Sequence, residues 1–205
     1  MSSIANTNTN TVIDEVSTVK RRLVQKRSIE ALVYRREDDL WDIEAELIDT
    51  KGSDFRLQSG IKKMGEAIHR MKIVMTINNA MNILKVNVHS LDNPYPGACS
   101  QIESAYQALI GLNLMKGFKK GVSERFNGLN GCSHITELCN VLPTAAIQAF
   151  GGELIDISNE NPDQPMPFQL NRCHALRTDG ETVKKYYPIW FGKSLEPAKI
   201  SKIPG

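Results

Sequence analysis

The segment from Trp41 to Leu47 alternates apolar and acidic residues without exception, and this alternation limits the fold of the chain more than any other feature. Successive side chains of a β-strand point to opposite faces, so the pattern predicts a strand with one buried face and one solvated face. A similar alternation over residues 29–33 precedes it, and the acidic run 37–39 between them predicts a turn. We therefore expect an antiparallel hairpin in this part of the chain.

Two further segments extend the expected sheet. His69 shares one face of a third strand with the apolar residues up to Ile77, and the pair Asn78-Asn79 predicts a turn. A fourth strand is expected over 83–89, where apolar residues again share one face. Residues 51–65, which include three glycines, are expected to form a loop.

Helical spacing replaces strand alternation after a proline-rich turn at residues 94–97. Nearer the end of the chain, 168–176 is expected to be a fifth strand and 181–187 a short helix. Strands first and helices afterwards predict an α+β fold, namely an antiparallel β-sheet of about four to five strands with three helices packed on one face. The three helices are expected over about 102–110, 118–126 and 134–150.

Length and composition indicate the domain organisation and the classes of partner. A chain of 205 residues that is 41% hydrophobic is long enough to bury one core. We expect a disordered polar lead over 1–20, a single α+β domain over 21–192 and a loose tail over 193–205. A formal net charge of +2 argues against a nucleic-acid partner. No apolar run approaches the ~20 residues that cross a bilayer, so we expect a cytoplasmic protein without a membrane partner.

Two short Cys/His pairs are the best sequence indication of a chemical site. Cys132 and His134 lie where a glycine-rich loop meets a predicted helix, and a helix N-terminus stabilises a thiolate. Cys132 is therefore the candidate nucleophile. Cys173 and His174 lie on a predicted strand, where neighbours face opposite sides, so only His174 would enter the site. A zinc site built from all four residues is the alternative, although its spacing lacks the usual Cys-x2-Cys pattern.

The remaining candidate site residues come from the predicted sheet and from scattered cations and aromatics. His69 lies on an apolar face, and Asp42 or Glu44 is expected to orient it, although a solvated strand face explains these acids more simply. Arginines would hold a carboxylate or phenolate, and aromatic rings would line the pocket, with ordinary packing as the alternative role. The expected substrate-binding residues are Arg36, Arg177, Tyr34, Trp41 and Tyr187.

Several common catalytic motifs are missing from the sequence. It contains no Gly-x-Gly-x-x-Gly after a strand, no phosphate-binding loop, no Gly-x-Ser-x-Gly elbow and no His-Glu-x-x-His. These absences argue against nucleotide-dependent redox chemistry, phosphoryl transfer and the common hydrolases.

Several motifs between about Arg22 and Trp190 together carry a family resemblance. They are Tyr34-Arg35-Arg36, Leu40-Trp41-Asp42-Ile43-Glu44, Asp49-Thr50-Lys51, Ile68-His69-Arg70-Met71, Gly117-Phe118, Gly131-Cys132-Ser133-His134-Ile135-Thr136-Glu137-Leu138 and Cys173-His174-Ala175-Leu176-Arg177-Thr178-Asp179-Gly180. On these motifs the chain resembles a bacterial family known as domain of unknown function 2889. Arg70 departs from the family pattern, which has an acidic residue there. The resemblance implies a single domain and small-molecule catabolism in bacteria that degrade aromatic compounds, but no particular activity.

These observations lead to one main hypothesis and two alternatives. The main hypothesis is a lyase or isomerase that needs no organic cofactor and applies general acid–base chemistry to a small aromatic catabolite. A zinc-assisted enzyme or metal-binding protein and a non-catalytic binding module are the alternatives, and a homo-oligomer is left open. We expect His69, His134 and His174 to line one cavity between the sheet and the third helix. The expected catalytic residues are His69, His134, His174, Glu44, Asp42 and Cys132.

Overall fold

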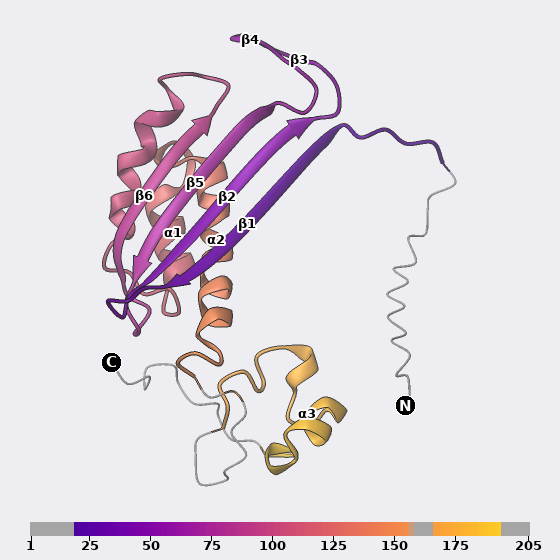
Figure 1. The fold of residues 1–205 in the computed structure, drawn as a ribbon, viewed down its shortest axis with the longest axis vertical. Helices are drawn as coiled ribbons and strands as arrows, with labels where there is room; N and C mark the ends of the chain where they lie inside the picture. The colour runs from indigo at the N-terminus through magenta and orange to yellow at the C-terminus, as the bar shows by residue number, and fades with distance from the viewer. Residues whose placement is uncertain (1–18, 156, 158–165, 194–205) are drawn as a thin grey trace, which may run out of the picture.

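Four long antiparallel strands form the main sheet of the protein, as the alternation predicts (Figure 1). The computed structural model describes residues 19–155, 157 and 166–193, so the predicted lead lies almost wholly, and the predicted tail all but its first residue, outside the described residues. The strand order is β1-β2-β5-β6, and each strand pairs with its neighbour in antiparallel register. The strands are β1 (Gln25–Arg35), β2 (Trp41–Lys51), β5 (Ala67–Ile77) and β6 (Ile83–Asp92).

A small hairpin projects from one end of the main sheet, where the sequence predicted only a loop (Figure 1). Its strands are β3 (Phe55–Leu57) and β4 (Gly60–Lys62), which pair only with each other among the described strands. The hairpin leaves the sheet after β2 and returns to it at β5, so it marks the end of the sheet that holds Lys51.

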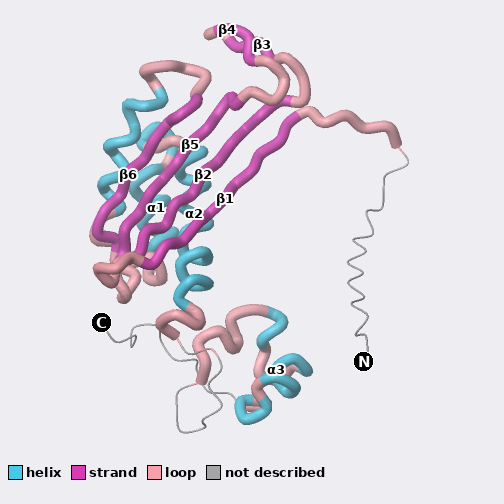
Figure 2. Tube along the Cα trace, in the orientation of Figure 1, coloured by secondary structure: helices cyan, strands magenta, loops and turns pink. Residues whose placement is uncertain are grey.

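The helices of the main body lie on one face of the sheet, which confirms the predicted α+β fold (Figure 2). The longest helix, α2 (Ser133–Phe150), packs against β1, β2 and β5, whereas the first helical segment, η1 (Cys99–Leu109), packs along β6. That first segment is a 3-10 helix rather than an α-helix. None of the helices among the described residues is long and apolar enough to span a membrane. The helical segments are η1 (Cys99–Leu109), α1 (Phe118–Phe126), η2 (Gly128–Asn130) and α2 (Ser133–Phe150).

The main core forms between α2 and the inner face of the sheet. Odd-numbered residues of β2, such as Ile43 and Leu47, are completely buried there, together with Leu138 and Leu142 of α2. Even-numbered residues of β2 lie on the outer face, and no described helix covers that face (Figure 2). Because successive side chains of a strand point to opposite faces, the odd-numbered residues of β2 face α2 and the even-numbered residues face away from it.

Residues from 166 onward form a small second cluster beyond the end of α2 (Figure 1). The predicted short helix is confirmed as α3 (Glu181–Tyr186), followed by η4 (Pro188–Trp190). The predicted fifth strand over 168–176 is wrong, because this segment consists of turns and the 3-10 helix η3 (His174–Leu176). Among the described residues, no strand lies beside it to complete a ladder. Whether the small cluster and the main body act as one domain stays a prediction.

Candidate functional site

Asp49 is a carboxylate in the apolar row of β2. The buried row Trp41, Ile43, Ala45 and Leu47 continues directly to this residue, which is 3% exposed. Arg27, its cross-strand partner on β1, bonds to both carboxylate oxygens at 2.8 and 2.7 Å. A bidentate guanidinium–carboxylate pair is the strongest geometry that two such side chains adopt, so it fixes the orientation of Asp49.

Two histidines meet the same oxygen of Asp49 from different elements. His69 lies directly opposite Asp49 in the β2–β5 register, and its Nδ1 is 3.2 Å from Asp49 Oδ2. His134, in the first turn of α2, places its Nε2 3.5 Å from that oxygen, which is ion-pair distance. The two imidazole rings lie against each other at a tilt of 30°, with their centroids 3.9 Å apart. Residues 65 positions apart in the chain thus form one cluster, as predicted for His69 and His134.

Cys132 contacts the other side of the His134 ring. Its Sγ lies 3.8 Å from Nδ1 of His134, while Nε2 of the same ring faces Asp49. A proton on Nε2 would leave Nδ1 as the acceptor that faces the thiol. The three side chains therefore form a thiol–imidazole–carboxylate series, the order of groups by which enzymes activate a nucleophile, with wider spacing than in a tight hydrogen-bonded triad.

The environment of Cys132 favours its thiolate. Burial of the thiol opposes ionisation, but the His134 ring and the main-chain N–H groups of Ile135 and His134 stabilise the negative charge. Their combined effect lowers the pKa of Cys132 below its ordinary value. Cys132 is the N-cap residue of α2, where N–H groups have no partner within the helix, so the position itself supplies these donors.

Tyr106 holds the backbone of Cys132 in place, a role that no sequence pattern indicated. Its hydroxyl accepts a hydrogen bond from the Cys132 N–H at 2.9 Å and lies 3.0 Å from both the Cys132 carbonyl oxygen and Thr136 Oγ1. The ring is fully buried and stacks on Phe126 at 4.2 Å. Burial raises the pKa of Tyr106, which keeps the hydroxyl protonated as a donor. Tyr106 thus fixes the position of the Cys132 backbone.

Glu137 is a second carboxylate bound to Arg27. Arg27 donates from Nη1 to Glu137 Oε2 at 2.5 Å, so one guanidinium links β1, β2 and α2. Burial of Asp49 opposes its ionisation, but the bonds from Arg27, with the nearby His134 and His69, outweigh burial and lower the pKa of this carboxyl. Asp49 is therefore a carboxylate at neutral pH, able to orient one imidazole or stabilise its protonated form.

The structure corrects the predicted roles of Asp42 and Glu44. Both are even-numbered residues of β2 and lie on the outer face, opposite to His69. Asp42 accepts a hydrogen bond from Thr76 at 2.7 Å, and Glu44 accepts one from Lys72 at 2.6 Å. They form the solvated face of the sheet, and Asp49 is the carboxylate that meets the histidines.

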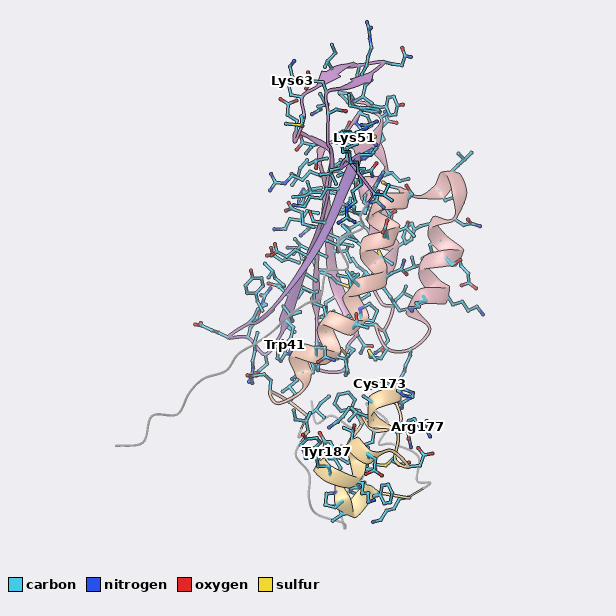
Figure 3. The ribbon with its side chains drawn as sticks, turned by 90° about the vertical axis from the view of Figure 1, so that its right-hand side faces the viewer. Trp41, Lys51, Lys63, Cys173, Arg177 and Tyr187 are labelled. Atoms are coloured by element: carbon cyan, nitrogen blue, oxygen red, sulfur yellow. The ribbon has the colours of Figure 1, made fainter. Side chains whose placement is uncertain are left out.

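His174 and Cys173 also lie away from the site. Figure 3 shows Lys51 near one end of the sheet, Trp41 toward the other end, and Cys173 beyond Trp41 in the second cluster. Asp49 and Trp41 are eight residues apart on one strand, which corresponds to roughly 26 Å. The predicted cavity with three histidines and the predicted zinc site that shares Cys132 with Cys173 are therefore wrong.

The predicted substrate-binding residues are not gathered around this site either. Trp41 is buried in the core, where its ring lies tilted against Phe150 with the centroids 4.5 Å apart. Figure 3 places Arg177 and Tyr187 in the second cluster, and Arg177 pairs with Asp179 on the surface. The other two lie at the far end of β1 from Arg27, where Tyr34 is on the outer face and Arg36 pairs with Asp38.

Asp49, His69 and His134 also offer three ligand atoms within 4.8 Å of one another, which a divalent ion would need. Two observations speak against an ion in this geometry. Arg27 already bonds to both Asp49 oxygens, and the ring centroids are 3.9 Å apart. Two imidazoles bound to one tetrahedral ion place their ring centres about 5 Å apart. The rings would have to separate before a metal could bind, so we treat the cluster as a hydrogen-bonded network.

The rate of alkylation should distinguish Cys132, the N-cap residue of α2, from Cys139 within the helix. Cys132 should react with iodoacetamide with a midpoint below the ordinary thiol pKa, because only the thiolate is nucleophilic. Cys139 is fully buried, and burial raises the pKa of this thiol to about 12, so it should not react in the folded protein. Peptide mass spectrometry after timed alkylation between pH 5 and 10 measures both. A midpoint for Cys132 at or above the ordinary value would reduce it to a packing residue.

Comparison with known proteins assigns the chain to one family. A family profile described as "Protein of unknown function (DUF2889)" matches residues 25–148. This range contains all six members of the cluster: Arg27, Asp49, His69, Cys132, His134 and Glu137. No curated protein and no solved structure is significantly similar to the chain.

Proposed function

Because this chain belongs to the DUF2889 family, whose description names no activity, we propose its function from the site alone: an enzyme that transfers protons through Cys132 and His134. The proposal rests on two contacts of the His134 ring. Its Nδ1 lies 3.8 Å from Cys132 Sγ, and its Nε2 lies 3.5 Å from Asp49 Oδ2. A thiolate and an imidazole with a fixed carboxylate behind them are groups that exchange protons near neutral pH.

The roles within this proposal follow from the contacts. His134 would act as the base or acid, with Asp49 orienting its ring. Cys132 would be the second proton-transfer group, or the nucleophile if the reaction is covalent. His69 bonds to Asp49 and its ring contacts that of His134, so it would limit rotation of the His134 ring. Arg27 would keep Asp49 ionised.

We propose a lyase or isomerase as the reaction class, because these reactions require proton transfer. A lyase or isomerase that acts on a small aromatic catabolite needs proton transfer at carbon or oxygen and no organic cofactor, which matches groups of this kind. The exposed fractions of the His69 and His134 side chains, 22% and 19%, support access for a small molecule. A cytoplasmic location belongs to the same proposal.

A comparison of the wild type with Cys132→Ser tests the proposal. Both proteins are incubated with a panel of phenols and aromatic acids, and products are followed by liquid chromatography and mass spectrometry. We expect the wild type to convert at least one compound and Cys132→Ser to lose at least ~100-fold in rate, since serine is far less acidic than the thiol. Cys173→Ser, an exposed cysteine of the second cluster, is the matched control and should retain the wild-type rate.

Two outcomes would contradict the proposal. Equal rates for wild type and Cys132→Ser would remove the thiol from the chemistry. Stoichiometric zinc or iron in protein purified without an affinity tag, lost in His69→Ala, would replace the metal-free network by a metal centre on Asp49, His69 and His134.

A further inference from the structure

Strand β1 is an edge strand, and one side of its backbone has no described strand beside it. It is 11 residues long, and β2 is its only neighbour in the described sheet (Figure 1). The Gly52 N–H bonds to the Val24 carbonyl and the Arg36 N–H bonds to the Leu40 carbonyl, one pair at each end of the β1–β2 ladder. In that register even-numbered residues of β1 bond to β2, so odd-numbered residues direct their N–H and C=O groups to the open edge.

Two charged side chains on the outer face of β1 have no ion-pair partner among the described residues. They are Lys26 and Glu30, and both are exposed. Glu30 lies opposite Glu46 of β2. Glu46 already forms an ion pair with Arg70, whose Nε is 2.9 Å from Glu46 Oε1. Like charges at facing positions destabilise a sheet, so Glu30 would be stabilised by a cation from the open side.

We propose that two copies of this chain pair through β1, antiparallel about a two-fold axis at Ser28, and form one continuous eight-stranded sheet. Around that axis Lys26 of each copy faces Glu30 of the other, which gives two symmetric ion pairs. Even-numbered residues then form the non-hydrogen-bonded pairs, where side chains approach most closely, while odd-numbered residues supply the backbone bonds. A two-fold axis requires such a self-complementary surface.

The exposed apolar residues on the same face fit the same register. Val24 is 56% exposed and Leu32 is 42% exposed, and each would lie opposite the other across the axis. Arg22 would lie opposite Tyr34, whose ring is 49% exposed and whose face attracts a guanidinium. One register thus pairs charge with charge and apolar with apolar, and strand addition of this kind is a common mode of association.

Pairing would also bring the second copy to the margin of the candidate site. On the inner face, Arg27 of one copy would lie opposite Ile29 of the other. Ile29 is 36% exposed, and its side chain would cover the Arg27 guanidinium that hydrogen-bonds to Asp49. The pairing itself depends only on β1 and is independent of the proposed function.

Charge reversal tests the register. Sedimentation of the wild type should give a dimer of 22.9 kDa chains, and Lys26→Glu should raise the dissociation constant by about tenfold or more, because it creates two like-charge pairs. The double variant Lys26→Glu with Glu30→Lys exchanges both charges and should recover dimerisation to within about threefold. Lys85→Glu, which reverses an exposed charge on β6 at the opposite edge of the sheet, is the matched control and should leave the dissociation constant unchanged.

A cysteine at the axis gives a second, geometric test. Ser28→Cys places two thiols at a close facing pair, where Cα atoms are about 4.5 Å apart, so a mild oxidant should link two chains. Glu30→Cys places its two thiols roughly 13 Å apart and should not cross-link to itself. Peptide mapping identifies the bond and excludes the native cysteines. A wild-type protein that stays monomeric at about 100 µM, a dimer that Lys26→Glu leaves intact, or no disulfide between the two chains of Ser28→Cys would each overturn the proposal.

Discussion

The His134→Ala variant should lose about 100- to 10,000-fold in turnover of the substrate that the compound panel identifies, because a positioned proton-transfer group contributes that much to rate. The same variant should also slow alkylation of Cys132 at pH 7, since the ring that stabilises its thiolate is gone. Alkylation needs no substrate, so the two measurements are independent.

His174→Ala is the matched control for this prediction. His174 lies in η3, in the second cluster and away from Asp49, so its replacement should change neither rate by more than about twofold. If His174→Ala lowered turnover as much as His134→Ala, the assignment of the site to the Asp49 end of the sheet would be wrong. Unchanged alkylation in His134→Ala would show that the imidazole does not act on the thiol.

The Asp49→Ala variant should lose about 2–3 kcal/mol of its free energy of unfolding, because it leaves the Arg27 guanidinium without its bidentate partner and opens the site. Urea unfolding followed by circular dichroism at pH 7 measures this. Glu46→Ala, three residues away on the outer face of β2, breaks only the exposed pair with Arg70 and should cost less than about 1 kcal/mol.

The effect of Asp49→Ala should depend on pH in a defined direction. A carboxyl whose pKa is lowered by folding stabilises the protein above its unfolded pKa of about 3.9, and this contribution disappears as the pH falls through the lower folded pKa. The difference in stability between wild type and variant should therefore shrink below pH 4. Equal losses at pH 7 and pH 3, or equal losses for Asp49→Ala and Glu46→Ala, would contradict the assigned role of Asp49.

Strand alternation predicted the main sheet correctly because it depends only on the two-residue period of a β-strand. The perfect alternation from Trp41 to Leu47 placed these odd-numbered residues on the buried face, and the structure agrees. The fifth strand over 168–176 failed for a complementary reason. A strand needs a partner backbone, and sequence period does not show whether one is nearby.

The same period contained a signal for Asp49 that the predicted site did not include. Two positions after Leu47, the buried row of odd-numbered residues on β2 reaches Asp49, which is an acid at a buried position. Asp42 and Glu44 are even-numbered and lie on the other face of the strand. A charge at a position reserved for apolar residues is costly unless it is paired, which by itself marks Asp49 as functional or ion-paired. Arg27 carries no comparable signal, because cations on an edge strand are common.

The sequence by itself determined the four long strands of the main sheet, the two faces of that sheet and the placement of Cys132 and His134 at the start of a helix, since these features depend on neighbours in the chain. Only the tertiary structure decided which groups meet that pair. The register of β2 against β5 sets His69 beside Asp49, and the packing of α2 on the sheet brings His134 to the same oxygen. Such contacts join segments far apart in sequence, and no local pattern specifies them.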